Sequence, residues 1–231
     1  MHADWAIERK ANSQTSTAFT DRREVRSVAR VLARVPSGAA VLDVPCASGR
    51  WLELLVGRGY RITCVDPSEI ALASAARHWE QIASASSSSP SKPRFVLGQP
   101  LQLNFPARHF DAVLCTGFFD RVGSSDLRIE ALRELRRLSR GPVIVSFCNA
   151  FALGALQLGA TRRRSPIDSA RRIPVPVWAF LNDLRRAGLN PVERHAVLWG
   201  ISPLWHIVSV PAAGRSAALL WPSSAGVAKA A

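Results

Sequence analysis

Hydrophobic and polar residues follow one another along this chain in blocks that predict strands and helices in turn. Short apolar runs predict five buried strands, at about 39–44, 61–66, 94–97, 110–116 and 143–147. Apolar residues at three- and four-residue spacing predict helices from about 20 to 36 and at 49–58, 68–84 and 126–140. This alternation favours a mostly parallel sheet with helices on both faces.

The C-terminal part of the chain changes this pattern. A helix at 177–187 precedes two strands, at about 191–198 and 205–210, whose short connection predicts an antiparallel hairpin. We therefore expect an α/β fold, with a Rossmann-like seven-stranded mostly parallel sheet, helices on both faces and a C-terminal antiparallel hairpin.

Regularity fades between residues 149 and 176, a segment too long for a plain connector, which predicts a lid-like insertion. The ends of the chain lack a core-forming pattern as well. We expect a flexible arm at 1–19, one domain at 20–211 and a disordered tail at 212–231.

Two acidic residues mark the ends of the first two predicted strands. Asp43 precedes a turn of small residues, and Asp66 follows 23 residues later. Such a turn lets a ligand approach the backbone, and the second carboxylate can accept hydrogen bonds from ribose hydroxyls. The turn lacks the GxGxxG pattern of dinucleotide sites, and the terminal hairpin replaces a second βαβαβ half. The pattern therefore indicates a nucleoside ligand other than a dinucleotide.

Taken together, these features resemble the class I S-adenosylmethionine-dependent methyltransferases, specifically their UbiE-like small-molecule branch. The resemblance covers about residues 20–210 and implies S-adenosyl-L-methionine as the cofactor. The matching segments, in order, are 41–49, 65–68, 98–101, 110–115 and 132–138.

The resemblance also assigns cofactor contacts along the carboxyl edge of the sheet. The methionine moiety would contact Asp43 and the turn Pro45, Cys46, Ala47, Ser48 and Gly49. The ribose would contact Asp66, and the adenine would contact Pro67, Ser68, Gln99 and Leu101. The sulfonium end would contact Cys115, Thr116 and Gly117. The family usually has glycine in place of Ala47 and aspartate in place of Gln99. An alanine narrows the turn only slightly, and the Gln99 amide oxygen can still accept a hydrogen bond from adenine.

The catalytic residue is left open by the sequence. Methyl transfer from a sulfonium needs no protonation of the leaving group, so positioning and desolvation can supply much of the rate. Asp120, on the exit loop of the fourth strand, is the best-placed candidate base. Candidate acceptor contacts are Phe118, Phe119, Arg121 and Arg163. We interpret His195 and His206, in the hairpin, as structural.

The four cysteines are scattered, without a CxxC pair or a histidine at metal-ligand spacing, so we expect buried thiols and no metal. A nucleophilic Cys46 is disfavoured because it follows the first strand rather than the fourth. The charged N-terminal residues and short apolar runs favour a cytoplasmic protein without a membrane span.

The net charge of +13 raises the question of a polyanionic partner. However, 27 of the 30 basic residues are arginines in an alanine-rich chain, a bias that a GC-rich genome can produce. We expect a small-molecule acceptor, which can be anionic, with O-methylation slightly favoured. The alternatives are an RNA-modifying methyltransferase and a non-catalytic binding protein with the same fold. The sequence does not assign an oligomeric state.

Overall fold

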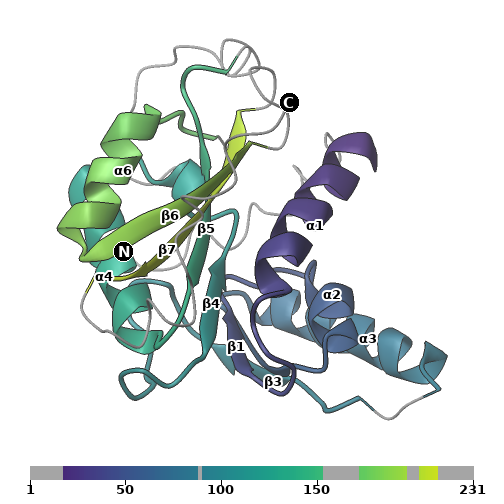
Figure 1. Ribbon diagram of the computed structural model, residues 1–231. Helices are drawn as coiled ribbons and strands as arrows, with labels where there is room; N and C mark the ends of the chain where they lie inside the picture. Colours follow the sequence, from purple (N-terminus) through teal and green to yellow (C-terminus); the bar gives the residue numbers. More distant parts are fainter. Residues whose placement is uncertain (1–17, 88–89, 153–171, 197–202, 213–231) are drawn as a thin grey trace.

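The computed structural model describes residues 18–87, 90–152, 172–196 and 203–212. They form one seven-stranded sheet in the order β3-β2-β1-β4-β5-β7-β6 (Figure 1). The first five strands in sequence are parallel, whereas β7 runs antiparallel between β5 and β6. This sheet confirms the predicted fold class. The strands are β1 (Ala40–Asp43), β2 (Arg61–Asp66), β3 (Arg94–Leu97), β4 (Ala112–Cys115), β5 (Val143–Cys148), β6 (Leu189–Ala196) and β7 (Leu204–Pro211).

Helices cover both faces of the sheet (Figure 1). On one face lie α1 (Ala18–Leu32), α2 (Leu52–Gly57) and α3 (Glu69–Ala85). On the other lie α4 (Ser125–Leu138), α6 (Val177–Arg186) and the short 3-10 helix η2 (Phe119–Arg121). Within the described residues, no helix is long and apolar enough to cross a membrane.

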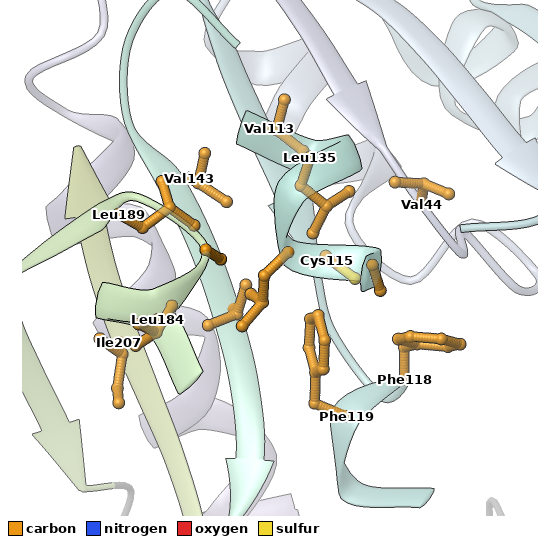
Figure 2. Close-up of a cluster of buried hydrophobic side chains, with 14 of the residues drawn as sticks. Val44, Val113, Cys115, Phe118, Phe119, Leu135, Val143, Leu184, Leu189 and Ile207 are labelled. Carbon is orange, nitrogen blue, oxygen red and sulfur yellow. The ribbon is translucent and has the colours of Figure 1, made fainter. Parts of the chain in front are cut away.

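Each face of the sheet has its own hydrophobic core, because both faces of the central strands are buried. On the α4 face, the Phe119 ring meets Phe180 edge-on at 5.5 Å, and Phe180 stacks on Phe147 at 4.4 Å. Figure 2 shows Phe119 among the aliphatic side chains of this core. The six residues of β5 are all buried, which places the middle of the sheet beyond the reach of water.

The helix after β1 begins later than the sequence predicts. We expected it to start at residue 49, but α2 starts at Leu52. The reason is backbone conformation: Ala47 and Gly49 have φ of 52° and 82°, which are incompatible with a right-handed helix. The residues between β1 and α2 form turns instead, and they shape the carboxyl edge of the sheet.

The ends of the expected insertion at 149–176 lie against the sheet. Val175 forms a parallel bridge with Asn149, directly after β5, and the amide of Ile173 donates to the carbonyl of Asp120 at 2.6 Å. The rest of this segment, the arm at 1–17, most of the tail and the hairpin turn lie outside the described residues.

A buried ion pair joins α4 to α6. Arg128 and Asp183 are 4% and 2% exposed, and the Arg128 Nε donates to Asp183 Oδ2 at 2.7 Å. Removing one partner leaves a buried charge uncompensated, so Asp183→Ala should lower the free energy of unfolding by about 3–5 kcal/mol. Urea denaturation measures this loss. Arg140→Gln, which breaks the half-exposed pair with Asp111, should cost less than about 1 kcal/mol. Equal losses in the two variants would contradict the assignment.

Candidate active site

Three loops at the carboxyl edge of the sheet meet at Asp66. Its Oδ2 accepts a hydrogen bond from the amide of Ala47 at 2.8 Å, and its Oδ1 accepts one from the amide of Ser68 at 3.0 Å. The backbone carbonyl of Asp66 accepts from the amide of Gly98 at 3.1 Å. Asp66 therefore joins the loops that follow β1, β2 and β3.

The turn after β1 is held tightly against its neighbours. The amide of Val44 donates to Leu114 of β4, and the amide of Cys46 donates to Val65 of β2, both at 2.9 Å. Gly49 packs so closely on α3 that a Cβ at this position would lie 3.3 Å from the Ala75 Cα. A glycine is required there for its positive φ as well as for this close approach.

Within this turn, the predicted contacts differ in exposure. Asp43, Pro45 and Cys46 are buried, Ala47 is half-buried and Ser48 is exposed. Ala47 holds a left-handed backbone conformation, which costs a residue with a Cβ about 1–2 kcal/mol. Its amide-to-Asp66 hydrogen bond helps to keep it there.

The Cys46 thiol is a poor nucleophile in this environment. It is 1% exposed, and a hydrogen bond with Cys64, burial and the nearby Asp43 carboxylate all raise its pKa far above the usual value. A thiol that stays protonated does not attack carbon. This geometry agrees with the expectation that Cys46 is not a catalytic nucleophile.

The end of β4 supplies a second wall of the candidate site. The indole of Trp51 donates to the Thr116 hydroxyl at 2.8 Å, and the amide of Gly117 donates to the Ser146 hydroxyl at 2.9 Å. Gly117 has a φ of 74°, and no heavy atom lies within 4 Å of the place where its Cβ would be. The space beside Gly117 is open. Cys115, in contrast, points into the core of the α4 face (Figure 2), where burial raises the pKa of its thiol.

The predicted adenine contacts gather beside Asp66. Pro67, Ser68, Gln99 and Leu101 are all half-buried. The Ser68 hydroxyl accepts from the amide of Ala71 at 3.2 Å and so caps α3. It is tied to the helix as well as to the candidate site.

The predicted acceptor contacts are only partly brought to this edge. Phe119 is fully buried and Phe118 is 6% exposed, so these rings pack in the core rather than form an open apolar wall. Arg121 is half-buried, and Arg163 lies outside the described residues. Asp120 is 3% exposed, and its Oδ2 lies 3.4 Å from the Arg172 Nε.

Sequence reasoning missed a charged cluster between α1 and the sheet. Glu24 of α1 forms an ion pair with Arg50, directly after the small-residue turn, and its Oε1 lies 3.3 Å from the Nε2 of His206 in β7. The three residues are far apart in sequence, and only the fold brings them together. A single signal was present: a glutamate close to the apolar stripe of Val28 and Val31 in the predicted first helix.

The comparisons with known proteins agree with this geometry. Residues 41–141 match the model of a methyltransferase domain. The matched residues cover 41–141 of the 231-residue chain and have the fold expected of a class I methyltransferase domain. The match spans the Asp43 turn, Asp66 and the end of β4, and it confirms the predicted class of enzyme. Comparison with curated protein sequences gives no match.

Solved structures share the fold of this chain at low sequence identity. Magnesium protoporphyrin IX methyltransferase from Synechocystis, with bound S-adenosylhomocysteine, is 16% identical, with 83% of each chain covered and a TM-score of 0.64. An S-adenosylmethionine-dependent methyltransferase from Clostridium acetobutylicum is 13% identical, with 86% of this chain and 94% of that chain covered and a TM-score of 0.66. The cyclase SpnF is 16% identical, with 82% of each chain covered and a TM-score of 0.63.

Two glycines close in sequence give a matched test of the turn. Gly49→Ala should lower the free energy of unfolding by about 1–3 kcal/mol, because the new Cβ meets the Leu52 side chain and the α3 backbone in a left-handed backbone conformation. Gly57 ends α2 with nothing within 4 Å of its Cβ position, so Gly57→Ala should raise stability by about 0.5–1 kcal/mol. Chemical denaturation measures both values. A tolerated Gly49→Ala would refute the close approach of α3.

The four thiols give a second test. All are free and buried, so Ellman's reagent should label less than one thiol per native chain and four in guanidinium chloride. Fast labelling of Cys46 in the native protein would contradict its protonated, enclosed state.

Proposed function

We propose that this protein is a methyltransferase of the UbiE-like branch. It would transfer a methyl group from S-adenosylmethionine to a small molecule, with O-methylation slightly favoured. One observation carries the proposal: the turn after β1, the carboxylate of Asp66 and the open side of Gly117 share the carboxyl edge of the sheet. In parallel α/β sheets, ligands bind at this edge.

The residues present fit the cofactor. The turn from Pro45 to Gly49 has only small side chains, so a ligand can approach its backbone. Each carboxylate oxygen has two lone pairs, so Asp66 can accept from ribose hydroxyls as well as from its two amide donors. The half-buried Gln99 and Leu101 flank the place where the adenine would lie. When bound, S-adenosylmethionine supplies the electrophilic methyl group.

In this proposal the chain's own residues position the reactants. Thr116 and Gly117, fixed by Trp51 and Ser146, form the wall beside the methyl group. Such preorganisation keeps the acceptor and the methyl carbon in line and excludes water. Asp120 is a candidate proton acceptor: among the residues that the structure describes, its buried Oδ1 has no hydrogen-bond partner.

An exposed aromatic pair supports a small, partly apolar acceptor. Phe151, just after β5, and Trp178, at the start of α6, lie 4.7 Å apart and are 62% and 60% exposed. They provide a surface on which an aromatic or lipid-like acceptor can pack. The side chain of Arg172, 44% exposed, can orient an anionic group there. The four buried free thiols suit a reducing compartment, in line with the cytoplasm that we expect.

The net charge of +13 is the observation that favours RNA as a second candidate substrate. Binding of RNA through phosphate contacts weakens steeply as salt rises. An affinity for generic RNA that is the same at low and physiological salt would count against this alternative. A non-catalytic binding role is the third candidate, since Ala47 and Gln99 stand where the family usually has glycine and aspartate.

Thermal unfolding with S-adenosylhomocysteine tests the cofactor. Ligand at about 100 times its dissociation constant stabilises by about 2.7 kcal/mol, which should raise the Tm of a chain of this size by about 5–10 °C. No shift at millimolar ligand would contradict the proposal.

The ribose contact has a matched control at the opposite end of the sheet. Asp66→Ala should raise the dissociation constant for S-adenosylhomocysteine at least about tenfold, since bonds to a charged group are worth about 1.5–3 kcal/mol. Asp111 also accepts from a backbone amide, that of Ala40 at 2.8 Å, but it lies at the amino ends of the strands. Asp111→Ala should leave the affinity unchanged. Equal affinities in the two variants would refute the role of Asp66.

A further inference from the structure

A row of polar side chains crosses three strands at the carboxyl edge. Cys115 pairs with Val145, so the next residues, Thr116 and Ser146, lie side by side, and Ser146 pairs with His206. On the same face, two residues further from the carboxyl edge, the equivalent row is fully apolar and belongs to the core under α1. It consists of Leu114, Ile144 and Val208. The face that α1 covers therefore changes from apolar to polar at the level of the candidate site.

Glu24, on the helix α1 that covers this face, lies next to the polar row. Its side chain is 4% exposed, and its two carboxylate oxygens have different partners. Oε1 lies 3.3 Å from the His206 Nε2, and Oε2 accepts from the Arg50 guanidinium. One buried carboxylate thus connects a helix, a strand of the hairpin and the turn that follows β1.

Arg50 links this carboxylate to the cofactor turn. It directly follows Gly49, and its guanidinium carbon lies 5.1 Å from the centroid of the Trp51 ring. Trp51 in turn donates to Thr116. A shift of Arg50 would move both the end of the small-residue turn and the indole that fixes the wall at β4.

We propose that Glu24 is a positioning residue of this methyltransferase: through Arg50 it holds the turn at 46–51 in the shape that binds S-adenosylmethionine, while its other carboxylate oxygen faces His206. The inference rests on the proposed function and adds a part of the chain, α1, that the cofactor contacts do not include. If Glu24 has this role, the position of α1 on the sheet affects the affinity for the cofactor.

Electrostatics agree with this assignment. Burial raises the pKa of Glu24, but the His206 imidazole 3.3 Å away and the hydrogen-bonded Arg50 guanidinium outweigh that effect, and the pKa lies below its usual value. The other charged groups at this place are His195 of β6, the register partner of His206, and Glu193, which binds His195 at 3.0 Å. His195 is thus already engaged by its own carboxylate.

Glu193 provides a matched control. Like Glu24, it is a little-exposed carboxylate with one histidine and one arginine partner, here His195 and Arg34. None of these residues belongs to the turn after β1. Glu24→Gln should raise the dissociation constant for S-adenosylhomocysteine about tenfold, equivalent to 1.4 kcal/mol, whereas Glu193→Gln should change it less than about twofold. Isothermal titration calorimetry measures both, with circular dichroism as the check of folding.

The pH dependence separates positioning from a purely structural role. In His206→Phe, Glu24 loses one of the two groups that lower its pKa, whereas burial and Arg50 remain, so this pKa rises above its wild-type value. The affinity for S-adenosylhomocysteine should therefore begin to fall at a higher pH in His206→Phe than in the wild type when the solution is acidified. Parallel pH profiles in the two proteins would overturn the inference.

Hydrogen exchange tests the inference without any ligand. In Glu24→Gln, amides of the peptide 46–52 should exchange faster than in wild type, and in Glu193→Gln they should not. Should Glu24→Gln fail to fold, Arg50→Met removes the same link from its half-exposed end and should show the same faster exchange. Unchanged exchange in these variants overturns the positioning role. A wild type that binds no S-adenosylhomocysteine overturns the proposed function, and exchange then still decides whether Glu24 orders the turn.

Discussion

The carboxylate of Asp66 holds together the edge of the sheet on which the whole site depends. It is fully buried, and its oxygens accept from the amides of Ala47 and Ser68, which belong to different loops. Burying a charge is costly unless hydrogen bonds compensate it, so these backbone donors are needed for stability. The same bonds hold Ala47 in its left-handed conformation. A residue expected to contact the cofactor is thus also what shapes the loop that would contact it.

The two faces of the sheet have different tasks. The α4 face is a continuous core of aliphatic and aromatic side chains, closed by the buried pair of Arg128 and Asp183. The α1 face is apolar at its base but polar at the carboxyl edge, where His206 lies 3.3 Å from Glu24. Both faces therefore have a buried core, and the α1 face also brings Glu24, Arg50 and His206 from three parts of the chain to the candidate site.

Much of this architecture could be predicted from the sequence because its signals are local. The apolar runs marked the strands, and the short connection marked the antiparallel hairpin. The start of α2 could not be predicted, since it depends on the left-handed conformation of Ala47, a residue that usually avoids it. The burial of Phe119 depends on Phe180 in a helix distant in sequence. The Glu24 cluster joins α1 to β7, and no local pattern encodes such a contact.

A crystal structure with bound S-adenosylhomocysteine tests the central claim most directly. We expect the ligand to lie across the carboxyl edge of the sheet. Its ribose hydroxyls should bind Asp66, its adenine should lie between Ser68 and Gln99, and its sulfur should lie beside Gly117. A ligand bound elsewhere, or a ribose that leaves the Asp66 carboxylate untouched, would contradict it.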